Sequence, residues 1–286
     1  MRAAKRIKGE GVLILLLLPS AAGLFMFYIA PFVISIYNAV IDNPVTKNFV
    51  GLKNFTDVLG SEAFRMAAGN TLTFMIICVP LNMVLPLVLA MLLTRAKTSR
   101  GFLWLIFLLP LVIPSGSMVF FWMKTFGLNG WINAVFFPQA PADWANTSAA
   151  RLIIVFIFLW KNAGYNMVLF LAGLNMIPAE YYECAAIEGA GAWRQFRMIT
   201  IVYLAPTLFL TFIMSFINSF KAFKEIYMLF GGYPHKSIYM LQHFMYNQFS
   251  AANYQKLAAS SYIVTPAFVA IVFALFVLQR KISENF

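Results

Sequence analysis

The feature that most constrains the fold is a long apolar run near the start of the chain. Residues 11–41 contain no charged side chain. A helix needs about 20 apolar residues to cross the hydrocarbon core of a bilayer, where it satisfies its own backbone hydrogen bonds. Similar segments recur along the chain, so the sequence predicts an all-α integral membrane protein with six transmembrane helices in one domain over 11–280. The predicted spans lie at about 11–40, 66–94, 101–123, 152–176, 198–220 and 257–279.

Composition agrees with this fold class. The 286 residues are 62% hydrophobic and 11% charged, whereas a soluble domain is about 25% charged. The net charge of +11 could indicate nucleic acid, but the basic residues lie between apolar segments, where they face the membrane surface. We therefore expect the lipid bilayer, and no nucleic acid, as a partner. The basic N-terminus is similar to that of a secretory signal, but its apolar run continues far past Ala22, and we expect a retained first helix.

Prolines interrupt several of the predicted spans. Such residues break helices in water, but in a membrane the neighbouring helices can satisfy the freed backbone groups. We therefore expect kinks rather than helix ends at these positions. They are Pro19, Pro31, Pro80, Pro86, Pro110, Pro114 and Pro206.

The distribution of basic residues predicts the orientation. Six spans place both termini on one side, together with the loops at 95–100 and 177–197. That side holds 11 Lys and Arg residues in 44 positions, and the other side holds 9 in 94 positions. Cytoplasmic loops carry the excess of positive charge. We therefore expect cytoplasmic tails at 1–10 and 281–286.

The sequence lacks the motifs of several functional classes. It has no nucleotide-binding P-loop, no G-x-S-x-G, no H-E-x-x-H and no C-x-x-C pattern. The two cysteines and two histidines suggest no metal site, and we expect His235 and His243 to be satisfied or solvated. The ten carboxylates lie on loops, on tails or just beyond span ends, Glu225 among them, which disfavours a proton-driven carrier. A stand-alone channel or secondary carrier for a small polar solute stays open as an alternative to a transport subunit.

The segment between the fourth and fifth predicted spans is unusually polar, with three carboxylates and two arginines. Pro178 suits the first turn of a new helix, and the Gly189-Ala190-Gly191 run permits a sharp turn. The pattern indicates a helix at about 178–191 that either docks a cytoplasmic partner or only connects two spans. Small side chains, which let another backbone approach closely, occur at Cys184, Ala185, Ala186 and Gly189.

A spaced signature stands within this segment. Glu183-Cys184-Ala185 is followed by Gly189 and then by the run 199–202, Ile-Thr-Ile-Val. The spacing resembles the EAA signature of ABC-importer permeases, Glu-Ala-Ala, Gly and Ile-x-Leu-Pro. Cys184, Ile201 and Val202 depart from it, and the missing proline predicts a straighter entry into the fifth span. Residues 50–55, 160–183 and 223–234 also resemble carbohydrate-uptake permeases of the maltose and glycerol-3-phosphate type.

This resemblance implies a type I ABC importer permease without an ATPase site of its own, in the membrane of a bacterial or archaeal cell. The implied partners are a second six-span permease, two cytoplasmic ATP-binding subunits and an extracellular sugar-binding protein. ATP and Mg would be bound by the ATPase, and this chain would need no cofactor. The EAA segment would be the coupling helix, which drives alternating access. Its implied ATPase-coupling residues are Glu183, Cys184, Ala185, Ala186 and Gly189.

A second group of polar residues lies inside the fourth predicted span. Lys161 is the only charge well within a span, and such charges usually face a cavity or a partner. Lys161 could line the pathway or pair with backbone carbonyls of the partner permease. Alternatively, the span could start nearer Trp160, with residues 151–159 in a protein-lined vestibule. Sugars bind to aromatic rings and amides, so the candidate pathway residues are Trp160, Lys161, Asn162, Tyr165 and Asn166.

Overall fold

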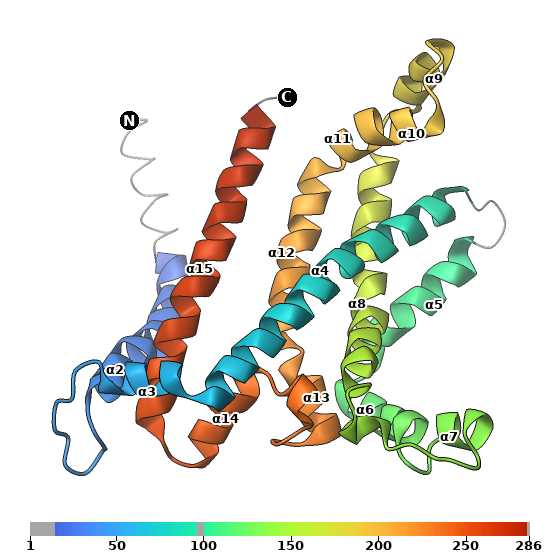
Figure 1. Ribbon diagram of the computed structural model, residues 1–286. Coiled ribbons are helices and arrows are strands. Elements are labelled where there is room, and N and C mark those ends of the chain that lie inside the picture. The colour runs from blue at the N-terminus through green and yellow to red at the C-terminus, as the bar shows by residue number, and fades with distance from the viewer. Residues whose placement is uncertain (1–14, 96–99, 285–286) are drawn as a thin grey trace, which may run out of the picture. The chain divides into compact units, whose positions relative to one another are not determined.

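The computed structural model describes residues 15–95 and 100–284, and their regular structure is helical apart from one bridge between Ile41 and Phe49. The chain divides into two compact units, shown together in Figure 1. The first comprises residues 1–62 and 245–273, and the second comprises 63–244 and 274–286. The all-helical fold class predicted from the sequence is confirmed.

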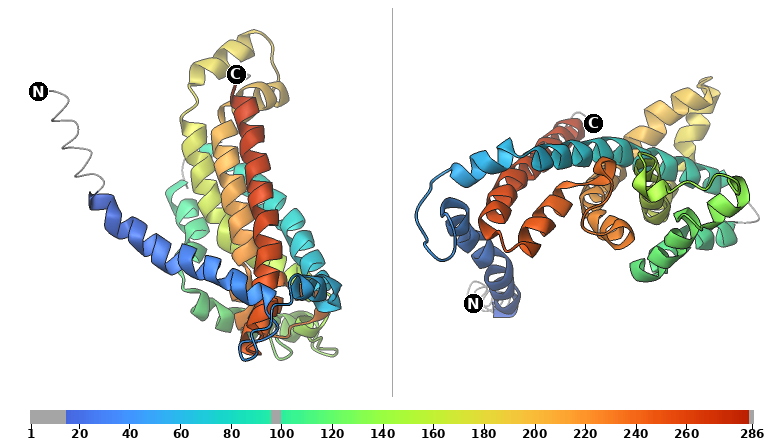
Figure 2. Two further views of the ribbon diagram at one scale, coloured as in Figure 1. Left: turned by 90° about the vertical axis from the view of Figure 1, so that its left-hand side faces the viewer. Right: turned by 60° about the horizontal axis from the view of Figure 1, so that its bottom comes forward.

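The first unit contains the N-terminal helical segment and most of the C-terminal helix. Residues 15–24 are α-helical, followed by the π-turn η1 (Phe25–Ile29) and α2 (Ala30–Val40). Pro31, near the start of α2, lacks an N–H, and the wider turn just before it accommodates the missing hydrogen bond. The unit also holds α3 (Lys53–Gly60) and the first two thirds of α15 (Tyr254–Glu284). The rings of Phe32 and Tyr262 lie 4.7 Å apart where α2 meets α15, and the two helices diverge from there (Figure 2).

The second unit is built around three long helices, α4 (Glu62–Arg95), α8 (Ala150–Asn175) and α12 (Ala205–Lys221). The shorter elements lie between and beyond them (Figure 1). They are α5 (Arg100–Val112), α6 (Ser115–Phe126), α7 (Trp131–Phe136), η2 (Trp144–Asn146), α9 (Ala179–Ile187), α10 (Ala192–Gln195), η3 (Phe196–Thr200), α11 (Ile201–Tyr203), α13 (Phe223–Phe230), η4 (Lys236–Ile238) and α14 (Leu241–Ser250), whose second half groups with the first unit.

Five helices in the described residues are long and apolar enough to cross a membrane, and a bent pair could make a sixth. The five are Leu15–Val40, Glu62–Thr94, Ala150–Asn175, Ala205–Phe230 and Tyr254–Val277.

The third predicted span is the bent pair. The helical segments Leu105–Val112 and Ser115–Phe136 meet at 106°, where the sequence led us to expect only a kink. Pro114 caps α6 in an extended conformation, with ψ of 136°. The residue before a proline is driven out of the helical region, so the helix ends at this position and restarts in a new direction.

The fifth predicted span also differs from expectation. The entry at 198–204 contains the π-turn η3, the short α11 and a break at Leu204, so it is not straight. Pro206 lies in the first turn of α12 and has no N–H to continue the preceding helix. The apolar stretch then runs on as Ala205–Phe230, ten residues beyond the predicted end at 220.

Two glycines of α8 set the packing of the second unit. A Cβ on Gly164 would lie 1.9 Å from the carbonyl oxygen of Phe107 on α5. A Cβ on Gly173 would lie 2.7 Å from side-chain atoms of Leu204 and Thr207. Small residues are typical where membrane helices approach each other closely. Both contacts position α8, which carries the candidate pathway residues.

Candidate functional site: a charged cavity and an exposed helix

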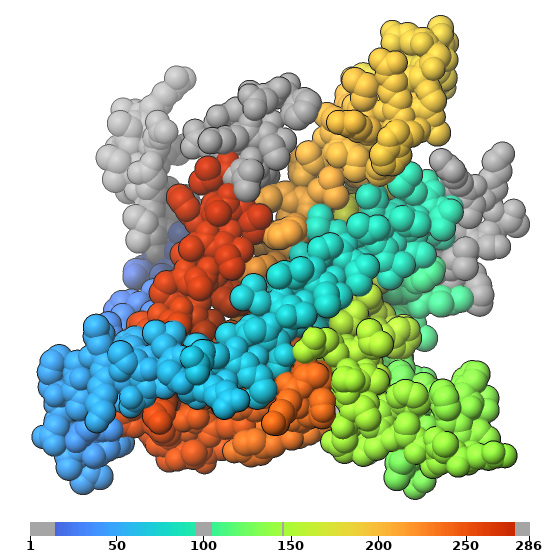
Figure 3. All heavy atoms as spheres, in the orientation of Figure 1, coloured from blue at the N-terminus to red at the C-terminus, as the bar shows by residue number. Residues whose placement is uncertain are grey.

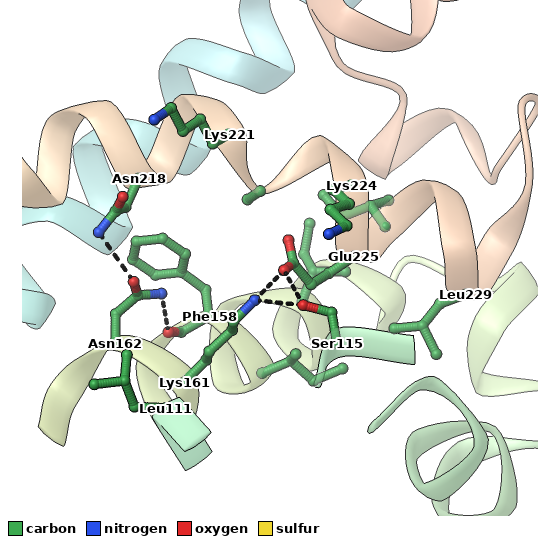
Figure 4. A pocket seen from close by; sticks show the side chains of 14 residues that line it. Leu111, Ser115, Phe158, Lys161, Asn162, Asn218, Lys221, Lys224, Glu225 and Leu229 are labelled. Carbon is green, nitrogen blue, oxygen red and sulfur yellow. Dashed lines mark hydrogen bonds and ion pairs between the residues drawn. The ribbon is translucent and has the colours of Figure 1, made fainter. Parts of the chain in front are cut away.

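A cavity of about 330 Å³ lies in the second unit, between α8 and the α12–α13 segment, with Leu111 and Ser115 on a further wall (Figure 4). The break at Pro114 places Ser115 there, because α6 starts at that residue. Most of the remaining lining is aliphatic or aromatic. The polar and charged residues that line the cavity are Ser115, Lys161, Asn162, Asn218, Lys221, Lys224 and Glu225.

An ion pair between Lys161 on α8 and Glu225 on α13 crosses this cavity. The Lys161 ammonium also donates a hydrogen bond of 2.9 Å to the Ser115 hydroxyl, which lies 3.3 Å from the Glu225 carboxylate. The Lys161 side chain is 30% exposed and that of Glu225 is 20% exposed. The pair therefore balances two charges that would be costly alone inside an apolar helix bundle, yet both remain accessible from the cavity.

Two amides form a second polar contact across the cavity. Asn218 on α12 donates a hydrogen bond of 3.2 Å to the side-chain oxygen of Asn162 on α8. Asn162 in turn donates to the Phe158 carbonyl at 2.8 Å. Figure 4 shows this amide pair on one side of the cavity and the Lys161–Glu225 pair on the other. Both groups have polar atoms that a bound polyhydroxyl molecule could contact.

The structure brings only part of the predicted pathway group to this cavity. Lys161 and Asn162 line it, whereas Tyr165 and Asn166 do not. Trp160 lines a small neighbouring pocket beside Lys161 and packs edge-to-face on Trp122, with ring centroids 5.2 Å apart.

Asn166 belongs to a buried network that ties three helices together. Its amide donates to the Asn82 carbonyl of α4 at 2.7 Å and to the Ser215 hydroxyl of α12 at 2.8 Å. The Asn82 amide donates to the same hydroxyl at 2.9 Å. All three residues are buried. Hydrogen bonds of this kind hold membrane helices together, so Asn166 has a structural role in the described chain.

Sequence reasoning missed the partner of Lys161. Glu225 was placed beyond the end of the fifth span, because that span was expected to stop at residue 220. The structure instead continues the helical stretch to Phe230, so Glu225 lies within that stretch. It is 64 positions from Lys161 along the chain. Two opposite charges in apolar surroundings were the available signal, since such residues usually pair with each other.

The predicted helix after the fourth span is present as α9, with Pro178 as its N-cap. It ends in a Schellman motif: the Ala190 N–H donates to the Ala185 carbonyl at 2.8 Å and the Gly189 N–H to the Ala186 carbonyl at 3.0 Å. This ending requires the left-handed backbone of Gly189, with φ of +80°. Gly189 therefore fixes the direction in which the chain leaves α9.

The surface of α9 is open along its whole length. None of its residues is buried, and Ile187 at its end is 88% exposed. Within the described residues, no basic group forms an ion pair with Glu180, Glu183 or Glu188. Figure 3 shows this segment standing clear of the rest of its unit. The helix is fixed at its base, where the Tyr182 hydroxyl lies 2.9 Å from that of Thr200.

Neither region contains a metal-binding cluster: the residues described include no group of three or more His, Cys, Asp or Glu side chains arranged to hold an ion. Cys184 is exposed on α9, and Cys78 is buried in α4. His243 is fully buried and accepts a hydrogen bond from the Met240 N–H.

Comparisons with known proteins identify the family. The model for the inner membrane component of binding-protein-dependent transport systems matches residues 67–285. The trehalose/maltose transport system permease protein MalF of Thermococcus litoralis is 31% identical over 249 residues, which cover 84% of each chain. The multiple sugar-binding transport system permease protein MsmF of Streptococcus mutans is 28% identical, over 95% of this chain and 94% of that protein. The family resemblance found in the sequence is thus confirmed.

The fold has a close counterpart among solved structures. A chain of a bacterial ABC transporter involved in the import of the acidic polysaccharide alginate matches with a TM-score of 0.86 at 21% identity. The match covers 98% of this chain and 99% of that chain. Because the family model matches most of the sequence as well, this multi-pass chain belongs to the inner membrane components of binding-protein-dependent transport systems.

Proposed function

We propose that this chain is a permease subunit of an ATP-driven importer of sugars, with oligosaccharides as the favoured substrates. Family membership makes it a transport subunit that relies on another subunit for ATP hydrolysis. The proposal of a sugar substrate is supported by the names of the relatives, which refer to trehalose and maltose, to multiple sugars and to starch degradation products. The proposed partners are a second six-span permease, two cytoplasmic ATPases and an extracellular sugar-binding protein.

The observation that carries this proposal is the open surface of α9. A helix without one buried residue, whose end is nevertheless fixed by a Schellman motif, is suited to enter a groove of another protein. We propose that Glu183 pairs with basic groups of the ATPase and that the small side chains of Cys184, Ala185 and Ala186, with Gly189, permit close approach. Movement of the docked helix would then switch the pathway between inward and outward access.

The membrane orientation follows from the same proposal. In the second unit, α9 lies at one end of the long helices, and α6, α7 and α13 gather at the opposite end (Figure 1). If α9 docks an ATPase, its end faces the cytoplasm. That assignment agrees with the density of basic residues, which independently predicts both termini in the cytoplasm.

We propose further that the 330 Å³ cavity is part of the sugar's path. Lys161 and Asn162 contribute to its wall together with Asn218 and Glu225, and these groups can hydrogen-bond to hydroxyls. Trp160 lies beside them and could stack on a sugar ring. Tyr165 and Asn166 would then support α8 from outside the cavity.

The decisive experiment reconstitutes the chain in liposomes with and without its ATPase. Uptake of at least one of two labelled probes, a neutral and an acidic oligosaccharide, should require the second permease, the ATPase, the binding protein and ATP together. A stand-alone channel or secondary carrier would instead transport with this chain alone, and that result would refute the proposal.

A further inference from the structure

The charges that line the cavity are not balanced. Three lysines and one glutamate contribute to its wall, and Glu225 is engaged by Lys161. Among the residues that the structure describes, no carboxylate forms an ion pair with the other two lysines, Lys221 and Lys224. Both are exposed, and Figure 4 shows them on the α12–α13 side of the cavity.

The position of these lysines makes the imbalance significant. Lys221 ends α12 and Lys224 lies in the first turn of α13, toward the end of the helical stretch Ala205–Phe230, which is a candidate membrane span. Unpaired charges are unfavourable in such a segment and usually mark the path of a substrate or ion. An anion entering the cavity would supply the missing counter-charge.

We propose that the transported sugar carries an anionic group, a carboxylate or a phosphate ester, and that Lys221 and Lys224 bind this group. The inference rests on the proposed function of the cavity as part of the sugar's path. An ammonium is a compact charge with three rotatable donors, so it accepts either kind of anion. The shared chemistry is therefore a sugar with at least one negative charge.

The remaining polar residues complete the site. Asn162 and Asn218 hold amide groups beside the cavity, where they can exchange their mutual hydrogen bond for bonds to sugar hydroxyls. Glu225 forms an ion pair with Lys161, and its negative charge repels an anionic sugar group from that part of the cavity. The cavity thus offers a cationic part at Lys221 and Lys224 and a nearly neutral part at Lys161.

The test measures equilibrium binding to the complete transporter complex in nanodiscs, in the absence of the binding protein. The probes are digalacturonate for a carboxylate, glucose 6-phosphate for a phosphate ester and maltose for a neutral sugar. At least one anionic probe should bind about tenfold more tightly than maltose, a difference of about 1.4 kcal/mol. The preference should shrink at high salt, because screening weakens the attraction of exposed charges.

Variants locate the effect. The double variant Lys221→Gln/Lys224→Gln should lower the affinity for the preferred anionic probe about tenfold and so remove its advantage over maltose. Lys124→Gln is the matched control, because Lys124 is also an exposed lysine but lies outside the cavity lining. Glu225→Gln should strengthen binding of the anionic probe, since it frees the Lys161 ammonium.

The outcomes separate this inference from the proposed function. Equal binding of all three probes, or an unchanged anion preference in the double variant, overturns the anionic substrate. ATP-dependent uptake of maltooligosaccharide in that case leaves the proposed function standing. A preference for digalacturonate or for glucose 6-phosphate supports the inference and identifies which anion the lysines bind.

Discussion

The α9 segment and the Lys161–Glu225 pair in the cavity show two opposite ways of placing polar groups in one membrane subunit. On α9 the carboxylates have no ion-pair partner among the described residues and the helix has no buried side chain. In the cavity, Lys161, Glu225 and Ser115 satisfy one another. A surface that leaves charges unpaired depends on another molecule, whereas a paired group can exist before any ligand arrives. The two regions should therefore respond differently to mutation.

The largest expected effect is on α9. Glu183→Lys reverses the charge proposed to face the ATPase, and Gly189→Trp adds a large side chain at a left-handed position that favours glycine. Each should reduce sugar-stimulated ATPase activity of the reconstituted complex by at least about 100-fold, which corresponds to about 2.7 kcal/mol of lost interaction, while the protein still reaches the membrane.

Gly191→Ala provides the matched control for the α9 variants. Gly191 has an ordinary φ of −66°, and a Cβ there meets no atom within 4 Å. Its ATPase activity should equal that of the unmodified complex. Normal coupling in Glu183→Lys and Gly189→Trp together would show that α9 only connects two helices.

The next effect concerns the scaffold that holds the cavity. Gly164→Ala introduces a Cβ against the backbone of Phe107, and overpacking of this kind costs about 1–3 kcal/mol. We expect a lower thermal midpoint in detergent, measured by fluorescence-detected size exclusion. Gly69→Ala on α4, where a Cβ meets nothing within 4 Å, should leave the midpoint unchanged. If Gly164→Ala and Gly69→Ala gave equal thermal midpoints, α5 and α8 could move apart without loss of stability.

A smaller effect is expected from the two amides Asn166 and Asn162, of which the first belongs to the buried network and the second lines the cavity. Asn166→Ala removes the donor to Ser215 and to the Asn82 carbonyl. Interhelical hydrogen bonds in membranes contribute about 0.6 kcal/mol on average, up to about 1.7, so the thermal midpoint should fall slightly. Sugar uptake per folded transporter should not change. Asn162→Ala should instead reduce uptake with little loss of stability, and the reverse pattern would exchange the roles assigned to the two amides.

The smallest effect lies in the loop after the first helix, outside both regions. A hydrogen bond from the Thr46 hydroxyl lowers the pKa of Asp42, with further bonds from Asn43 and Asn48. A lowered pKa means that this loop is stabilised above the ordinary pKa of an aspartate, near 3.8, and loses that stabilisation as the pH falls through the lowered value.

Hydrogen exchange of the peptide 43–50 between pH 5 and pH 2 can detect the change at Asp42. After correction for intrinsic rates, protection of the Asn48 amide, which bonds to Asp42, should decrease on acidification. Asp42→Asn should show low protection at every pH. A protection factor that stays constant in the unmodified chain contradicts the role of this carboxylate.

The sequence was a good guide to α9 because its determinants are local. Pro178 at the N-cap and Gly189 at the C-terminal turn lie within a dozen residues, and each acts through its own backbone geometry. The family spacing added the expected role. The sequence also identified Lys161 as an unusual charge, because a single charged residue in an apolar segment can be recognised without knowing the fold.

The cavity could not be predicted in the same way. Its ion pair joins residues 64 positions apart, and their meeting depends on how α8 and α13 cross. Periodicity reports which residues share a helix face but not which helices meet. The sharp bend at Pro114 was likewise underestimated, because a proline in a span can cause a mild kink or a complete break, and the surrounding packing decides between them.

The two segments that connect α9 to the rest of its unit differ in how continuous their helices are. On one side α8 runs for 26 residues from Ala150 to Asn175 without a proline, a length of about 39 Å, and residues 176–178 separate it from α9. On the other side η3, α11 and the break at Leu204 interrupt the way to α12. A displacement of α9 would therefore be transmitted to the cavity through one continuous long helix on the α8 side and through several short helical pieces on the other side. The continuous helix α8 carries Lys161. If an ATPase docks on α9 as proposed, its movement would therefore reach the cavity mainly through Lys161 and less through Glu225.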